Sequence, residues 1–160
     1  MSEVPPRERR PAGDAHVFLA QVMHPADANF QGNIHGGLIM RLIDEAAGTA
    51  AYRFCRGRVV TAHIDSIDFH HPVHIGEVIM LKASVNYAGR TSMEIGVRVE
   101  AENLATGAVI HTNSAYLVFV ALDHEGRPTE VPELVPETDE EKRRYVAAKE
   151  RRARRTAGQG

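Results

Sequence analysis

The segment 37–54 most constrains the fold, because its apolar residues recur at helical spacing and cover more than one stripe of a helix. A surface helix carries a single apolar stripe, whereas a wider apolar surface has to be covered from several sides. We therefore expect a central, buried helix that ends near Gly57, a residue type favoured at a helix C-cap. The apolar residues are Leu38, Ile39, Leu42, Ile43, Ala46, Ala47, Ala50, Ala51 and Phe54.

After Arg58 the apolar period changes from about 3.6 to about 2, which is typical of strands. In the first strand the apolar parity switches near Asp65–Ser66, which predicts a β-bulge and one long, bent strand. Strands at hairpin spacing indicate an antiparallel meander. The sequence therefore predicts an α+β fold with an antiparallel sheet wrapped around a long central helix. The segments expected as strands are 16–23, 59–69, 79–87, 93–101 and 109–122.

The chain of 160 residues, 43% of them hydrophobic, fits one globular domain, which we expect over 15–135. The Pro- and Arg-rich segment 1–14 has no apolar core and reads as a disordered lead-in, not a secretory signal. In the tail, 136–160, Thr138 and Glu141 have the spacing of a capping box that opens a charged helix. Its basic run, 149–155, could contact phosphate groups, although a solvated helix face is the simpler interpretation. Two pairs could support this helix by about 0.2–0.5 kcal/mol each, Asp139 with Arg143 and Glu140 with Arg144.

Composition argues against several classes of function. A formal net charge of −2 gives no argument for nucleic acid or an anionic membrane surface, and no apolar run approaches the roughly 20 residues that span a bilayer. The single cysteine, Cys55, excludes an internal disulfide and suits a reducing, cytoplasmic location. The histidines at 70, 71 and 74 lack the spacing of a closed metal site, because neighbours on a strand point to opposite faces. We expect no metal and no cofactor.

A polar, glycine-rich loop over 24–36 runs directly into the helix and predicts an active site. Gly36 and Gly37 allow close approach of a ligand to the unpaired N–H groups of the helix N-terminus. Asp44 lies among small residues one to two turns along this apolar helix, where burying an acid is costly. It could act as a general base or a nucleophile, or it could be a structural partner of a neighbouring arginine, Arg41 or Arg53. Glu45 points about 100° away around the helix and reads as a partner for a basic residue.

Five segments resemble the hotdog-fold acyl-CoA thioesterases, specifically the cytosolic acyl-CoA hydrolases. The resemblance implies the hotdog fold and hydrolysis of fatty acyl-CoA to free fatty acid and coenzyme A, which is part of the substrate and not a cofactor. It implies that Asp44 is the catalytic carboxylate and that Asn29 reaches the site from the neighbouring subunit. A homodimer is then the minimal active unit, and such dimers commonly stack into hexamers as trimers of dimers. The segments are DANFQGNIHGG at 27–37, MRLIDEAAG at 40–48, VVTAHIDSIDFHHPVHIGEV at 59–78, GRTSMEI at 89–95 and VPETDEEKRR at 135–144.

Further residues complete the expected site. Asn29 offers both a hydrogen-bond donor and an acceptor and could orient water, although it could equally be an Asx-turn residue. The N–H of Gly37 could polarise the thioester carbonyl, with His35 and Gly36 beside the substrate. Coenzyme A brings phosphates, for which the resemblance favours the residues after the Gly89 turn, although these could also form an exposed hairpin tip. Those residues are Arg90, Thr91 and Ser92.

Two other functions stay open at this point. A dehydratase or hydratase of acyl thioesters would place a histidine beside the acid, and His35 is the candidate. A non-catalytic acyl-CoA-binding module is the second alternative, and the presence of both Asp44 and Asn29 counts against it.

Overall fold

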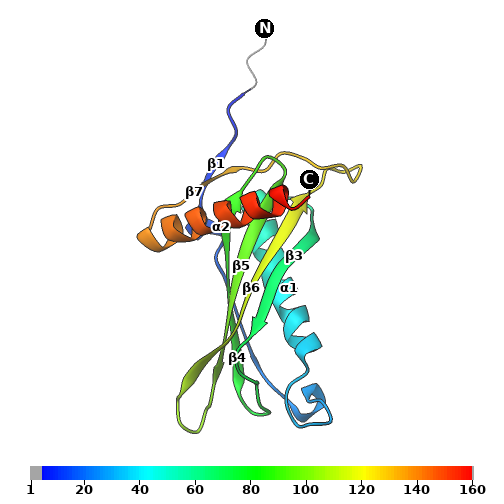
Figure 1. Ribbon diagram of the computed structural model, residues 1–160, viewed down its shortest axis with the longest axis vertical. Helices are drawn as coiled ribbons and strands as arrows, with labels where there is room; N and C mark the ends of the chain where they lie inside the picture. Colours follow the sequence, from blue (N-terminus) through cyan, green and yellow to red (C-terminus); the bar gives the residue numbers. More distant parts are fainter. Residues whose placement is uncertain (1–4, 160) are drawn as a thin grey trace.

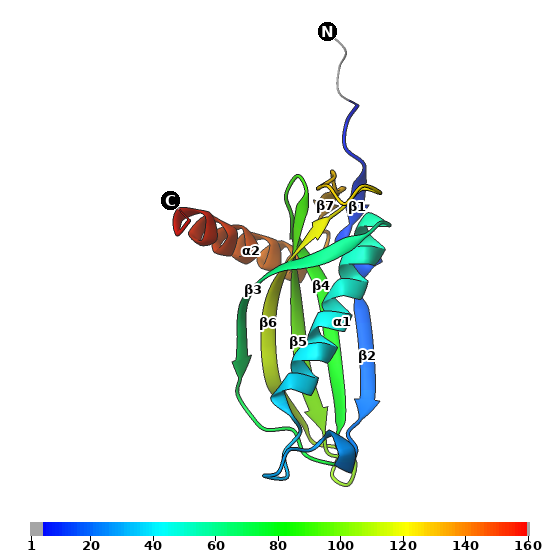
Figure 2. The ribbon, with the colours of Figure 1, turned by 90° about the vertical axis from the view of Figure 1, so that its right-hand side faces the viewer.

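A five-stranded sheet curves around one long helix in the computed structural model, which describes residues 5–159 (Figures 1 and 2). The strand order is β2-β4-β5-β6-β3, and all neighbours are antiparallel. The expected α+β architecture is confirmed. The elements are β1 (Arg9–Pro11), η1 (Ala12–Ala15), β2 (Val17–Val22), η2 (Pro25–Asp27), α1 (Gly36–Cys55), β3 (Val59–Phe69), β4 (Val78–Ala88), β5 (Ser92–Glu102), β6 (Val109–Ala121), β7 (Glu133–Val135) and α2 (Asp139–Ala157).

Helix α1 packs into the concave face of the sheet, where its apolar residues form the core with the inward-facing residues of β4, β5 and β6. The helix extends to Cys55, one residue beyond the expected segment 37–54, and its C-cap is the residue before Gly57. Arg56, not Gly57, adopts the left-handed conformation, with a φ of 56°, and its N–H donates to the Tyr52 carbonyl at 2.7 Å. A non-glycine residue in this conformation costs roughly 1–2 kcal/mol.

Strand β3 lies at one edge of the sheet and contains two irregularities. The register against β6 shifts between Thr61 and His63 and again between Ile64 and Ser66. The second shift confirms the bulge expected near Asp65–Ser66, whereas the first was not expected from the apolar pattern of the strand. Each bulge bends the strand and re-aims its side chains.

Helix α2 lies across the opposite face of the sheet from α1 (Figure 2). The expected capping box is confirmed. Glu141 N–H donates to Thr138 Oγ1 at 3.1 Å, and the Glu141 carboxylate accepts from the N–H groups of Thr138 (3.1 Å) and Glu137 (2.7 Å). Arg144 pairs with Glu140 at 2.5 Å as expected, but Arg143 also approaches Glu140, at 3.9 Å, instead of Asp139.

The expectation of a disordered lead-in over 1–14 is wrong for most of its length. Strand β1 pairs in parallel with β7, and Arg7 donates to the carbonyls of Gly89 (2.6 Å) and Val131 (3.1 Å). These backbone and guanidinium hydrogen bonds fix a polar segment without an apolar core. Residues 1–4 lie outside the described part of the chain. Within residues 5–159, no helix is long and apolar enough to span a membrane.

Candidate active site

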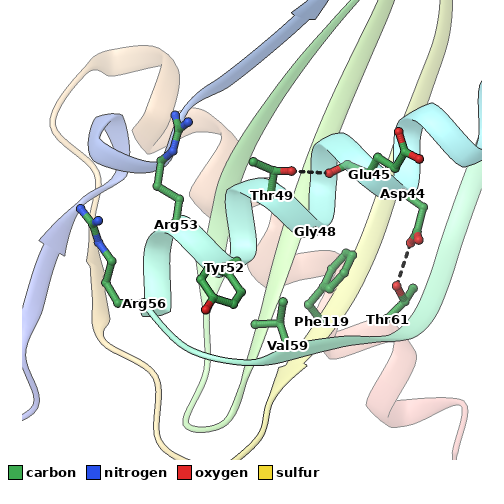
Figure 3. A pocket seen from close by; sticks show the side chains of 10 residues that line it. All are labelled: Asp44, Glu45, Gly48, Thr49, Tyr52, Arg53, Arg56, Val59, Thr61 and Phe119. Atoms are coloured by element: carbon green, nitrogen blue, oxygen red, sulfur yellow. Dashed lines mark hydrogen bonds between the residues drawn. The ribbon is translucent and has the colours of Figure 1, made fainter.

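A groove of about 720 Å³ opens between α1 and the first half of β3 (Figure 3). At one end of it Thr61 Oγ1 donates to Asp44 Oδ1 at 2.7 Å. Gly48, one turn along the helix, leaves the space beside Asp44 open down to the ring of Phe119. The lining residues are Asp44, Glu45, Gly48, Thr49, Tyr52, Arg53, Arg56, Val59, Thr61 and Phe119.

Asp44 is exposed to this groove in the single chain, which differs from the expectation of a buried acid. The two arginines that could have neutralised it are engaged elsewhere. Arg41 pairs with Glu45 at 3.4 Å, which confirms the role expected for Glu45, and Arg53 donates to the His16 carbonyl at 2.6 Å. Among residues 5–159, no cationic side chain lies within ion-pair distance of Asp44. The carboxylate therefore has a neutral hydroxyl partner and no counter-ion.

Asn29 lies in the loop before α1 and does not line the groove around Asp44. Its Oδ1 accepts from the N–H groups of Gln31 (2.9 Å) and Asn33 (3.2 Å), so the Asx-turn alternative describes its local role. This arrangement leaves the Nδ2 amide, a donor, for another partner. The single chain does not bring the two expected catalytic residues together.

The N-terminus of α1 has the form that the sequence predicted. The exposed residue His35 is the N-cap, and its carbonyl accepts from the N–H groups of Leu38 (3.1 Å) and Ile39 (3.2 Å). The N–H groups of Gly36 and Gly37 come before those of Leu38 and Ile39 in the helix. They have no acceptor within the helix. A Cβ on Gly37 would meet nothing within 4 Å, so the backbone there is open to a ligand.

The turn at Gly89 lies at the other end of the molecule from the loop that carries Asn29 (Figure 2). Arg90 is exposed, whereas Thr91 and Ser92 are half-buried. Ser92 Oγ accepts from the Arg152 guanidinium of α2 at 3.2 Å. The turn is thus held against α2, and Arg90 is the side chain of this turn that is available to a phosphate.

The histidines considered for a metal site are dispersed. His63 lies 3.7 Å from Asp65, and the His70 ring meets the edge of His111 at 5.3 Å. Over residues 5–159, no three His, Cys, Asp or Glu side chains converge in a way that could hold a metal ion.

Sequence reasoning missed Thr61, the residue that touches Asp44. It precedes the unexpected bulge at Ala62, so the simple alternation of β3 gave no reason to place it beside α1. Phe119 on β6 and Tyr52 on α1, which shape the groove, were also missed. Both are aromatic residues whose sequence positions do not distinguish a groove wall from an ordinary place in the core or on the surface.

An antiparallel sheet wrapped around one long helix is the hotdog fold, and an acid on that helix facing an open groove fits the thioester hydrolases among the proteins of this fold. The Thioesterase superfamily matches residues 31–108. The uncharacterized acyl-CoA thioester hydrolase YkhA of Bacillus subtilis is 39% identical over 134 residues, which are 84% of this chain and 78% of the relative. The chain belongs to the hotdog-fold acyl-CoA thioesterases and is a thioester hydrolase.

Solved structures agree with this assignment. The acyl-CoA hydrolase of Staphylococcus aureus, in complex with butyryl coenzyme A, coenzyme A and coenzyme A disulfide, superposes with a TM-score of 0.89 at 35% identity and covers 94% of this chain and 92% of its own. Structures in which an asparagine, an aspartate or a threonine of that enzyme is replaced by alanine also match, with TM-scores of 0.91, 0.89 and 0.88. A hexameric acyl-CoA thioesterase gives a TM-score of 0.93 at 37% identity, covering 96% of this chain and 98% of its own.

Proposed function

We propose that this chain hydrolyses fatty acyl-CoA to free fatty acid and coenzyme A, with Asp44 at the reacting centre. The contact between Asp44 and Thr61 carries the proposal. Thr61 holds Oδ1 at 2.7 Å, and the other carboxylate oxygen remains free at the mouth of the groove. A carboxylate oriented by a neutral donor keeps its charge for the reaction, whereas an arginine partner would neutralise it.

The reaction needs water and the groups described above. Acting as a general base, Asp44 takes a proton from the water that attacks the thioester carbonyl. The tetrahedral intermediate then expels the coenzyme A thiolate as the carbon–sulfur bond breaks, and the thiolate recovers the proton. Acting as a nucleophile, Asp44 would instead form an anhydride that water hydrolyses to regenerate the carboxylate. In both routes the Gly37 N–H of the copy that supplies Asn29 donates to the carbonyl oxygen as negative charge develops there, because Gly37 and Asp44 of one copy lie seven residues apart on α1.

We propose that Asn29 completes the site from a second copy of the chain. Its Oδ1 is held by the loop, so its Nδ2 is the group that can donate to water or substrate. Strand β3 offers a place for the second copy, because it pairs only with β6 and leaves its other edge free. Val60 and Ile64 on this strand are 39% and 44% exposed. Pairing with another strand is one of the ways in which proteins cover such an edge.

The similar enzymes support this assembly. The three residue types replaced in the Staphylococcus aureus hydrolase are the types found here at Asn29, Asp44 and Thr61. The hexameric relative supports stacking of three dimers. We assign the apolar part of the groove to the acyl chain, the helix N-terminus at His35 and Gly36 to the thioester region, and the phosphates of coenzyme A to the turn with Arg90, Thr91 and Ser92.

Mixing two inactive variants tests both the residues and the assembly. Asn29→Ala and Asp44→Asn chains are each purified, unfolded together in equal amounts and refolded, and thiol release from acyl-CoA is measured. If each site takes Asn29 from one chain and Asp44 from the other, random pairing gives mixed dimers with one intact site and restores roughly a quarter of wild-type activity. Refolded single variants are the controls. Full activity of either variant alone, or no recovery on mixing, contradicts the proposal.

The hydratase alternative requires a histidine beside the acid. Within one chain none of the ten residues that line the groove is a histidine, and His35 could reach the acid only from the second copy. Hydration of crotonyl-CoA, measured beside thiol release, separates the two activities. We expect thiol release alone.

A further inference from the structure

Four charged side chains join α2 to the outer face of the sheet at the end nearer the C-terminus. Glu94 on β5 has a side chain only 1% exposed, and Arg151 holds it through Nη2 at 2.7 Å and Nε at 3.1 Å. The Arg151 guanidinium also lies 3.7 Å from the centre of the Tyr116 ring. Arg155, one turn later, approaches Glu94 at 3.4 Å and Asp65 at 3.2 Å. Arg151 and Arg155 of the basic run are therefore engaged by carboxylates and not free for phosphate, whereas Lys149 and Arg154 are exposed.

The contact with Asp65 matters because of where that residue lies in β3. Ile64 pairs with Leu117 and Ser66 with Tyr116, so Asp65 is the extra residue of the second bulge and has no partner in the ladder. A bulged edge strand is held less firmly by backbone hydrogen bonds than a regular one. Arg155 holds one oxygen of Asp65, and His63 lies 3.7 Å from the other. The path of the bulge is thus tied to α2 by an ion pair.

The position of Thr61 depends on the same path of β3. It pairs with Phe119 immediately before the first bulge, four residues from Asp65, and its hydroxyl must meet Asp44 on the other side of the sheet from α2. Between the two bulges only two residues pair with β6. A displacement of Asp65 therefore has little ladder structure to absorb it before it reaches Thr61.

Stability alone does not explain the choice of charged residues. Well-packed apolar residues stabilise as much as a buried ion pair or more, whereas an ion pair also fixes direction and distance. Both ends of the connection are largely buried, since the side chains of Arg155 and Asp65 are 16% and 22% exposed.

We propose that Arg155 and Asp65 are positioning residues that hold β3 so that Thr61 reaches Asp44, which makes α2 part of the apparatus that sets turnover. The inference rests on the proposed function, in which Asp44 and Thr61 lie at the reacting centre. Neither Arg155 nor Asp65 touches the substrate.

The test combines Arg155→Met and Asp65→Asn with Thr61→Val, using the full-length chain and thiol release from acyl-CoA. In the background that contains Thr61, each substitution should lower kcat about tenfold, because a small displacement of a reacting group is costly, while KM changes by less than about twofold. In the Thr61→Val background the same substitutions should have no further effect on kcat, since residues that act through one contact are not additive. Arg155→Lys, which keeps the charge, should restore part of the lost turnover.

Arg144→Met is the matched control. Arg144 donates to Ser84 at 3.0 Å, so its loss removes another contact between α2 and the sheet without involving β3, and kcat should stay unchanged. A crystal structure of Arg155→Met provides a readout that does not depend on activity. We expect Thr61 Oγ1 to lie beyond hydrogen-bond distance of Asp44 there.

The outcomes separate the two proposals. If Thr61→Val and Asp44→Asn both keep wild-type turnover, the proposed site is wrong and this inference falls with it. If Thr61→Val is impaired while Arg155→Met and Asp65→Asn keep wild-type kcat, the site stands and the positioning role is wrong. An equal loss of kcat in both backgrounds, or an unchanged contact between Thr61 and Asp44 in the variant structure, also overturns it.

Discussion

The acidic residues at the two long helices of this protein have opposite kinds of partner. Helix α1 is apolar and carries Asp44 toward an open groove, where its hydrogen-bond partner is a neutral hydroxyl. Helix α2 is highly charged and lies against acids of the sheet, where Arg151 and Arg155 neutralise Glu94 and Asp65. Both helices are long, and they cover opposite faces of one sheet (Figures 1 and 2).

This difference in partners separates a carboxylate that can take part in the reaction from carboxylates that hold the structure. A buried acid with arginine partners contributes fixed geometry, and removing one partner leaves an uncompensated charge. An exposed acid without a counter-ion contributes little to stability, and its charge stays available to a reacting group. Substitution of Asp44 and substitution of Glu94 should therefore affect different quantities, whereas Asp65 and Arg155 are proposed to act on turnover through Thr61.

Asp44→Asn should have the largest effect, and on turnover alone. Loss of a general base lowers kcat by roughly 10³-fold, which is about 4 kcal/mol of activation free energy. The free energy of unfolding should change little, because Asp44 forms no ion pair within residues 5–159 and asparagine keeps an oxygen that can accept from Thr61. Thiol release and urea denaturation measure the two quantities. Glu45→Gln, one residue along the helix, is the control and should keep turnover within about twofold. Retention of a tenth or more of wild-type kcat by Asp44→Asn would contradict the assignment.

Glu94→Gln should show the reverse pattern. The substitution leaves Arg151 and Arg155 facing a neutral amide in a largely buried site, so the free energy of unfolding should fall by about 3 kcal/mol. Urea denaturation at one fixed protein concentration measures it, because assembly shifts the apparent stability. Glu140→Gln removes a solvent-exposed pair with Arg144 and should cost less than about 1 kcal/mol. Equal losses for the two variants would show that the pairs under α2 are not structural.

The position of α1 in the core could be predicted from the sequence, whereas the contacts of α2 with the sheet could not. A wide apolar surface predicts a buried helix wherever it occurs, and the loop before it predicts a site. Thr61 could not be placed, because the bulge at Ala62 changes the phase of β3 and bulges have a weak sequence signal. The partners of Arg151 and Arg155 come from strands far away in the chain, and a basic run looks the same whether it faces water or a carboxylate. The order of the N-terminal segment rests on hydrogen bonds such as those of Arg7, which composition does not reveal.

Thr61→Val should lower turnover by less than Asp44→Asn does, because it removes the hydrogen-bond partner of the acid on α1 and leaves the acid itself in place. Valine keeps the shape of threonine but cannot donate to Asp44, and a hydrogen bond to a charged group contributes about 1.5–3 kcal/mol, so kcat should fall by roughly 10- to 100-fold. Thr156→Val removes a hydroxyl that bonds only to backbone carbonyls at the end of α2 and should leave kcat unchanged. Steady-state thiol release with both variants is the measurement. A wild-type kcat for Thr61→Val would mean that Asp44 does not need this partner.

The smallest expected effect is on the free energy of unfolding, when the capping box of α2 is removed, and this effect depends on pH. Burial alone would raise the pKa of Glu141, but the N–H groups of Glu137 and Thr138, together with nearby His16 and Arg144, lower this pKa below its ordinary value of 4.5. A lowered pKa means that the carboxylate stabilises the fold above pH 4.5 and loses this contribution as the pH falls through the native pKa. Glu141→Gln should therefore cost about 1 kcal/mol near neutral pH, and its difference from wild type should shrink as the solution becomes more acidic.

Urea denaturation of both proteins at several pH values measures this difference. Turnover near neutral pH should remain at the wild-type level, because the cap holds the start of α2, whereas Asp65 and Glu94 meet its final turns. A gap between the two proteins that stays constant with pH would show that the Glu141 contribution does not come from its charge. A loss of turnover as large as that of Thr61→Val would show that the start of α2, and not only its final turns, affects catalysis.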